Sequence, residues 1–240
     1  MIRRSLVPII RSTASINRFT THFQTRMLLT ISQSLDEAYK KHKIIPDVVD
    51  KFATQGLLTI EYDQDNKVSL GNTLAVDQTQ KIPLIQYTLN SPHQDGAVET
   101  IGQDDRFILV LTDPDAPSNS DPKWSQYLHW LITDLKIVEH DSDTNSDTIN
   151  HVLDFSKGQE VIPYMGPGPP ANTGKHRYVF LLYKQDPDAK LSPPSDRPNW
   201  GTGIPRYGVR DWITKYGKSS KLLSVNFFYA QNEQNEHSDK

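Results

Sequence analysis

Cysteine is absent from the 240 residues, and no apolar run approaches the length of a membrane-spanning helix. The lack of cysteine excludes a disulfide scaffold, a thiolate metal site and a cysteine nucleophile, and it fits a cytoplasmic protein. A transmembrane segment is excluded because it needs about 18 or more consecutive apolar residues. Neither sign of charge dominates, with 26 Lys and Arg against 29 Asp and Glu. A general nucleic-acid binder needs a basic surface, so this class of protein is not expected.

The first 33 residues differ in composition from the rest of the chain. Residues 1–35 contain five Arg and ten Ser or Thr but no Lys, Asp or Glu, which leaves a net charge of −8 on the remainder. This composition is typical of a mitochondrial transit peptide. The alternative is a start codon assigned too far upstream, with translation beginning at Met27. We therefore expect a leader at 1–33, a folded domain at 34–230 and a polar tail at 231–240. A functional leader predicts a mitochondrial protein, and otherwise the cytoplasm or the vacuole is expected.

Short β-like segments dominate residues 34–230 and are separated by stretches rich in Asp, Asn, Pro and Gly. Such a pattern predicts strands joined by turns. Eight strands are expected, at Leu57–Tyr62, Lys67–Leu70, Leu84–Leu89, Arg106–Thr112, Tyr127–Val138, Glu160–Met165, Arg177–Lys184 and Leu222–Ala230. Short helices are expected near the two ends of the domain, at Leu35–His42 and Gly208–Tyr216, with a further turn at Val48–Phe52 and a solvated loop at Asp141–Thr148. Many strands with few helices predict an all-β fold, an antiparallel β-sandwich.

An acidic segment containing proline follows the most apolar predicted strand. Asp113, Pro114 and Asp115 come at the end of Arg106–Thr112. Proline favours extended backbone in itself and in the residue before it, so two carboxylates are held at the end of a strand. A solvent-exposed acidic turn explains the same residues, and the segment alone does not decide between a binding site and a turn.

His129 lies inside a predicted strand. Its neighbours Leu128 and Trp130 face the opposite side of the sheet, because successive side chains of a strand alternate. Taken alone, a strand histidine is more often a hydrogen-bonded structural residue than a ligand.

A loop rich in glycine and proline leads into another strand. Gly168 and Pro170 lie in this loop, where glycine lets a ligand approach the backbone closely. His176 and Tyr178 follow two residues apart and therefore point to one face of the strand. Arg177 points to the other face, where an Asp could pair with it. Two interpretations stay open: an ordinary loop before a core strand, or a set of donors suited to an anionic group.

No catalytic or metal-binding motif is apparent in the sequence. The two His and two Asp lack the spacing of an HExxH or similar site, so neither a metal nor a cofactor is predicted. A G-x-S-x-G nucleophile elbow, a GxGxxG fingerprint and a P-loop are also missing, so the sequence does not predict an enzyme.

Taken together, these segments resemble the phosphatidylethanolamine-binding protein (PEBP) family. DPDAPS at Asp113–Ser118 and GPPANTGKHRYVFLLY at Gly168–Tyr183 look like the two signature segments of that family, in the expected order. The resemblance implies a β-sandwich with a small site for a phosphate-like anion or a phospholipid headgroup. It also implies the residues that line this site: Asp113, Pro114, Asp115, His129, Gly168, Pro170, His176 and Tyr178. We infer that Asp113 holds one imidazole as a cationic donor toward the anion.

Four further segments resemble the branch of the family that inhibits a serine carboxypeptidase: Ala38–Val49, Gly71–Leu74, Asp196–Gly201 and Ser224–Ala230. This branch implies a non-enzymatic inhibitor whose N-terminal segment obstructs the protease active site, here Met27, Leu28, Leu29, Thr30 and Ile31. It also implies a role in regulating the Ras pathway. The alternative is a module that binds phospholipid or small anions without a protease partner. A ribosomal role is disfavoured, because contact with RNA calls for a basic surface and the body of the chain is acidic.

Overall fold

The computed structural model describes most of the predicted domain. The described residues are 33–89, 100–124, 126–140, 150–198, 200 and 203–232. The predicted leader, apart from Gln33, and the predicted loop Asp141–Thr148 lie outside these residues, as does the tail beyond Asn232. None of the described helices combines the length and the hydrophobicity of a membrane span.

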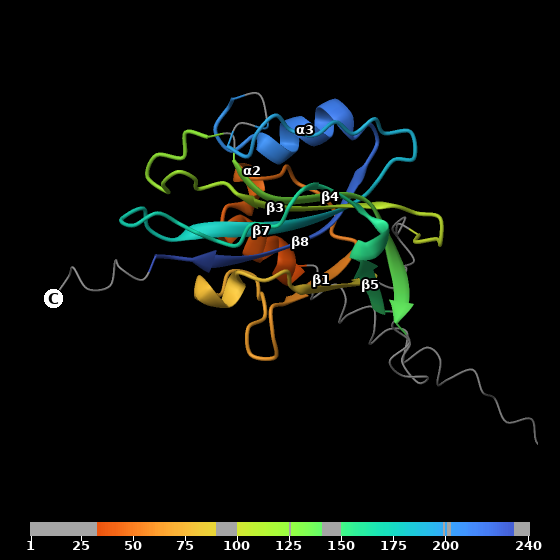
Figure 1. The fold of residues 1–240 in the computed structure, drawn as a ribbon, viewed down its shortest axis with the longest axis horizontal. Helices are drawn as coiled ribbons and strands as arrows, with labels where there is room; N and C mark the ends of the chain where they lie inside the picture. Colours follow the sequence, from red (N-terminus) through yellow and green to blue (C-terminus); the bar gives the residue numbers. More distant parts are fainter. Residues whose placement is uncertain are drawn as a thin grey trace, which may run out of the picture.

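Eight strands form the body of the protein (Figure 1). They are β1 (Gly56–Glu61), β2 (Leu84–Leu89), β3 (Phe107–Asp113), β4 (Tyr127–His140), β5 (Asn150–Asp154), β6 (Gln159–Ile162), β7 (His176–Lys184) and β8 (Lys221–Ala230). The strands are hydrogen-bonded in the order β1-β2-β5-β4-β3-β7-β8, and β6 pairs with β4. All of these pairings are antiparallel. The predicted all-β fold is confirmed.

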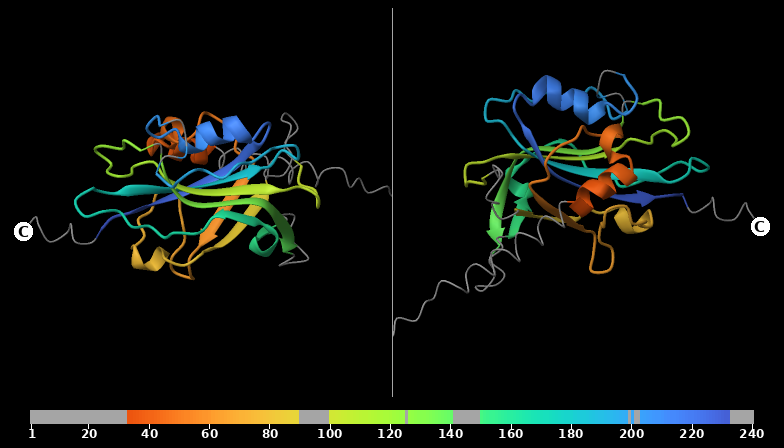
Figure 2. Two further views of the ribbon diagram at one scale, coloured as in Figure 1. Left: turned by 45° about the horizontal axis from the view of Figure 1, so that its top comes forward. Right: turned by 180° about the vertical axis from the view of Figure 1, so that it is seen from behind.

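β4 belongs to two sheets. Its first half pairs with β3 and β6, whereas from Lys136 onward it pairs with β5. Between the two halves Asp134 has a left-handed backbone, with a φ of 55°. The sheet of β1, β2, β5 and the end of β4 therefore lies across from the sheet of β6, β4, β3, β7 and β8, as the two layers of a sandwich (Figure 2).

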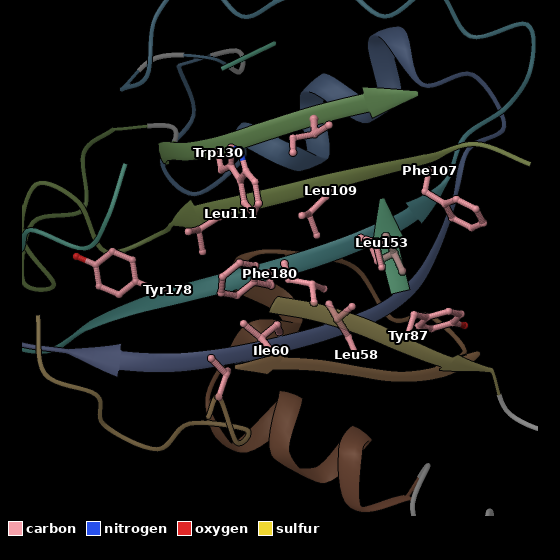
Figure 3. Packing of buried hydrophobic residues seen from close by; sticks show 14 of the residues in the cluster. Leu58, Ile60, Tyr87, Phe107, Leu109, Leu111, Trp130, Leu153, Tyr178 and Phe180 are labelled. Atoms are coloured by element: carbon pink, nitrogen blue, oxygen red, sulfur yellow. The ribbon is translucent and has the colours of Figure 1, made fainter. Parts of the chain in front are cut away.

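β3 and β7 are buried on both faces. On one face Leu109, Leu111 and Phe180 belong to the cluster packed between the sheets (Figure 3). On the other face Val110 and Leu181 belong to the cluster under the helices. A strand covered on both sides has apolar residues at successive positions rather than at alternate ones, which explains the continuous hydrophobic runs in these two segments.

Helices cover the outer face of the second sheet. The first helix comprises residues 33–41, and α2 (Ile44–Asp47) and α3 (Gly208–Tyr216) follow, with short 3₁₀ turns η1 (Asp77–Thr79) and η2 (Phe155–Lys157). Leu35 and Tyr39 of the first helix and Trp212 of α3 belong to one buried cluster. Leu35 and Tyr39 lie four residues apart, a spacing that places both on the same side of a helix. The predictions of a first helix near Leu35–His42 and of α3 are confirmed.

Two predicted elements are wrong. Residues Lys67–Leu70 do not form a strand, and Lys67 makes only an isolated bridge with Glu61. The turn predicted at Val48–Phe52 lies earlier, as α2, because Lys43 adopts a left-handed conformation (φ 54°) that ends the first helical segment and lets a second begin.

Two further strands differ from the prediction. β5 is missing from the predicted set, because its sequence is largely polar and only His151 and Leu153 are buried. β6 covers Gln159–Ile162 instead of Glu160–Met165. It ends before Pro163, which has no N–H to donate to a ladder.

Candidate functional site

The ends of three strands meet at one edge of the second sheet. Asp113 is the last residue of β3 and lies opposite Tyr127, the first residue of β4. β7 begins at His176 and runs antiparallel to β3, so the start of β7 lies beside the end of β3. Asp113 and His176, which are 63 residues apart in the sequence, are thereby brought into contact.

A buried chain of hydrogen bonds joins Asp113, His176 and Thr173. His176 Nδ1 lies 2.7 Å from Asp113 Oδ2, and both side chains are almost completely buried. His176 Nε2 lies 2.9 Å from Thr173 Oγ1, and that hydroxyl donates to Pro170 O at 2.7 Å. The direction of the contact between Nε2 and Thr173 depends on the tautomer of the ring. The short contact at Nδ1 confirms the predicted hydrogen bond between Asp113 and an imidazole.

His129 lies beside this pair but has a different environment. Its Nδ1 lies 2.8 Å from Met165 O, which can only accept, so Nδ1 carries the proton. Burial lowers the pKa of His129, although the charge of Asp113 acts in the opposite direction. A neutral imidazole that donates through Nδ1 has its lone pair on Nε2, so His129 adds an acceptor to the site.

Tyr178 packs against the His129 ring. The two ring centroids are 5.1 Å apart in an edge-to-face arrangement, and on its other side Tyr178 stacks on Phe228 at 5.4 Å. Burial and then the charge of Asp113 raise the pKa of the Tyr178 phenol, so the hydroxyl stays protonated and is a donor. Figure 3 shows this hydroxyl directed away from the other labelled side chains of the core. We call Asp113, His129, His176 and Tyr178 the histidine cluster.

The loop before β7 forms the exposed border of the histidine cluster. Gly168 and Pro170 are exposed, whereas Pro169 between them is buried. A Cβ added to Gly168 would meet no atom within 4 Å, so the backbone at this position is open to a ligand. Pro114, next to Asp113 in the sequence, is buried.

Asp115 is placed differently from its expected position in the site. Both of its oxygens bind Arg177: Nε and the backbone N–H donate to Oδ2 at 2.9 Å each, and Nη2 donates to Oδ1 at 2.7 Å. Arg177 lies on the face of β7 opposite to His176 and Tyr178, as the alternation of the strand requires. Asp115 is therefore the Asp expected to pair with Arg177, and its carboxylate belongs to an ion pair under the helices.

Sequence reasoning missed two participants in the site. Thr173 and Met165 supply the hydroxyl and the carbonyl that orient the two imidazoles. A hydroxyl residue three positions before a strand histidine was a visible signal for Thr173, but a backbone carbonyl carries no signal in the sequence. The predicted protease-contacting segment, Met27, Leu28, Leu29, Thr30 and Ile31, lies outside the described residues.

Two surface cavities among the described residues lie away from the histidine cluster. A cavity of about 450 Å³ lies between β6 and the loop after β7 and includes Arg106, Asp134 and Trp212. A second, of about 480 Å³, lies over β2 and β5. Neither is lined by the histidine cluster. In the described part of the chain no three His, Asp or Glu side chains are arranged to hold a metal ion.

Comparison with known proteins identifies the family. The family model described as Phosphatidylethanolamine-binding protein matches residues 50–228. The chain is 40% identical to the carboxypeptidase Y inhibitor of Saccharomyces cerevisiae, over 85% of this chain and 97% of the inhibitor. It is similar to the crystal structure of a carboxypeptidase Y inhibitor complexed with its cognate proteinase, with a TM-score of 0.75 and 39% identity, over 84% of this chain and 97% of the inhibitor. A phosphatidylethanolamine-binding protein from Plasmodium vivax shares the fold, with a TM-score of 0.59 and 23% identity, over 82% and 97% of the two chains. The chain therefore belongs to the phosphatidylethanolamine-binding protein family.

Proposed function

We propose that this protein is a non-enzymatic inhibitor of a serine carboxypeptidase. The observation that carries the proposal is the 40% identity to the yeast carboxypeptidase Y inhibitor, which extends over 97% of that protein. A similarity of the whole backbone to an inhibitor seen with its proteinase supports it. In this proposal the segment Met27–Ile31, directly before the first helix, enters the protease active site.

The polarity of the hydrogen bonds in the site supports a protein without hydrolytic activity. Asp113, His176 and Thr173 are connected in the order of an acid–base–nucleophile triad, with gaps of 2.7 and 2.9 Å. A nucleophilic hydroxyl must give its proton to the imidazole. Here Pro170 O lies 2.7 Å from the Thr173 hydroxyl and competes with the imidazole for its proton. We expect no turnover of p-nitrophenyl esters above that of the Thr173→Ala variant, and turnover that Thr173→Ala abolishes would contradict this proposal.

The inhibitory role is tested with the purified full chain and with a form that begins at Met27. Both are titrated against carboxypeptidase Y with a chromogenic peptide substrate. The Met27 form is expected to inhibit, and Leu28→Asp is expected to raise the inhibition constant at least about tenfold, because burial of a leucine is worth about 1.5–3 kcal/mol. Ser34→Asp, at the start of the first helix, is the matched control for an added negative charge.

Absence of inhibition by both forms at micromolar concentration would refute the inhibitory role. Mass spectrometry of the mature N-terminus separates the two interpretations of the leader. A cleaved leader would support mitochondrial import, and a chain that begins at Met27 would support a cytoplasmic or vacuolar protein.

A second function, binding of an anionic group, is favoured by the convergence of the histidine cluster below the open backbone of Gly168. The Tyr178 hydroxyl is the donor suited to an oxygen of a phosphate or a phospholipid headgroup. Titration calorimetry with phosphate and with phosphorylethanolamine tests this function, and vesicles with phosphatidylethanolamine distinguish a lipid from a free anion. Tyr178→Phe is expected to weaken binding about tenfold, as for loss of one hydrogen bond to a charged group.

Tyr164→Phe is the matched control for this titration, since its hydroxyl binds Thr79 O at 2.7 Å outside the histidine cluster. Equal affinities for the two variants would refute the assignment of Tyr178. Anion binding without any protease inhibition would favour the alternative function, a binding module without a protease partner. Regulation of the Ras pathway stays a prediction from the resemblance.

A further inference from the structure

The first helix is attached to the body of the protein in two ways. Along its length, Tyr39 packs in the cluster under the helices, stacks on Phe52 with ring centroids 5.7 Å apart, and donates to Val225 O at 2.7 Å. The apolar contacts are non-directional, and the hydrogen bond of Tyr39 fixes the middle of the helix rather than its end. The second attachment is polar and lies just beyond the last helical turn.

Arg177 holds the end of the helix by its backbone. Its Nη1 donates to the carbonyl oxygens of His42 and Lys43, at 3.0 and 2.9 Å. Both residues directly follow the helix, which ends at residue 41, and a cation near the C-terminus of a helix interacts favourably with the helix dipole. Because Arg177 binds backbone carbonyls, this attachment fixes the position of the chain whatever side chains the helix carries.

The guanidinium itself is fixed by two carboxylates. Besides its contacts with Asp115, Nη2 donates to Asp47 Oδ2 of α2 at 2.9 Å. All three nitrogens of the guanidinium therefore donate, and the side chain is only 6% exposed. Burial by itself would lower the pKa of Arg177, but the ion pairs with Asp115 and Asp47 raise it, so the charge is permanent. A planar group with every nitrogen engaged has a single orientation.

We propose that Arg177 is a positioning residue for protease inhibition: it fixes the first helix, the element that follows the segment Met27–Ile31 in the sequence. This inference rests on the proposed inhibitory function. A segment that leaves from a fixed helix loses less conformational freedom when it enters an active site than one that leaves from a mobile helix. Asp47 is the part of this attachment that can be changed without touching the pair of Arg177 and Asp115.

The test compares two variants of the Met27 form, Arg177→Lys and Asp47→Asn. A lysine ammonium cannot reach two carboxylates and two carbonyls at once. We expect Arg177→Lys to raise the inhibition constant for carboxypeptidase Y about tenfold, because one further residue must then be ordered on binding. Asp47→Asn is expected to raise it about threefold. Hydrogen exchange at residues 38–43 is expected to become faster in both variants, with no change in β3.

Two control variants separate positioning from a general loss of stability. Asp188→Asn removes an exposed carboxylate that pairs with Lys218 at 2.7 Å. Tyr164→Phe removes a hydrogen bond to Thr79 O at 2.7 Å in the cluster between the sheets, and so lowers the melting temperature without touching the first helix. Both controls are expected to keep the inhibition constant of the parent protein, measured well below their melting temperatures.

An unchanged inhibition constant in Asp47→Asn and Arg177→Lys would overturn the proposal, as would an equal rise in Tyr164→Phe. If Arg177→Lys does not fold, Asp47→Asn decides alone. If the parent protein does not inhibit carboxypeptidase Y, the proposed function fails, and hydrogen exchange still tests whether Arg177 fixes the helix. Unchanged exchange at residues 38–43 would then refute that part as well.

Discussion

Asp113→Asn tests the central pair of the histidine cluster. Asp113 accepts two hydrogen bonds, from Asp115 N to Oδ1 at 2.8 Å and from His176 Nδ1 to Oδ2 at 2.7 Å. Asparagine has the same shape but offers one acceptor oxygen, so one of the two N–H groups must face the amide NH₂. The side chains of Asp113 and His176 are 4% and 1% exposed, so water cannot replace the lost partner.

The magnitude follows from the loss of one acceptor. One buried donor without a partner costs about 1–3 kcal/mol, and more when the lost partner is a charged group. We therefore expect the free energy of unfolding to fall by about 2–3 kcal/mol.

The assay is urea denaturation at pH 7, followed by the fluorescence of the four Trp. Asp188→Asn is the control, since it removes a carboxylate from an exposed pair, for which no measurable change is expected. Phosphate binding is measured in the same variants, and it should weaken in Asp113→Asn because the imidazole loses the carboxylate that orients it. A decrease in stability below about 1 kcal/mol would show that the pair contributes little and would refute this reasoning.

Two further predictions follow from the same region and from a turn. The pKa of His129 is below its usual value of 6.5 because of burial. Below about pH 6.5 the unfolded chain therefore binds more protons than the native state, and stability decreases as the pH falls. In denaturation curves at pH 5–7.5, His129→Gln should reduce the dependence of stability on pH, and an unchanged dependence would exclude His129 as its source. Gly71→Ala should destabilise the protein by about 2–3 kcal/mol, because φ is 103° and a Cβ would lie 2.9 Å from the His42 and Phe227 rings. Gly168→Ala should instead keep the stability and weaken phosphate binding. Thermal unfolding measures the stabilities and calorimetry measures the binding, and equal stabilities of the two variants would contradict the prediction.

The parts of the fold that are buried on both faces could be predicted from the sequence. β3 and β7 are long apolar runs, and their bounds differ from the predicted ones by one residue at the ends. β5 could not be predicted, since a short polar strand is stabilised by its neighbours β2 and β4 rather than by its own residues. The position of α2 depends on the left-handed backbone of Lys43, which residue type alone does not indicate.

The residues of the candidate site could be predicted from the sequence, but their hydrogen-bond partners could not. Strand alternation placed His176 and Tyr178 on one face and Arg177 on the other, and the structure confirms it. Strand alternation could not show that Asp113 and Asp115, two positions apart, bind partners on opposite faces of β7. The reason is that Asp115 lies beyond the last residue of β3, where strand alternation no longer applies.

The passage of β4 from one sheet to the other has a mechanical consequence. A sandwich whose halves are joined only by loops can open like a hinge, because each half keeps its own ladder of hydrogen bonds. Here the two layers share one continuous piece of backbone through Asp134, so peeling them apart breaks the pairing of β4 with β3 or with β5. When force is applied to the two sheets in opposite directions, the protein should unfold in a single step rather than one layer at a time.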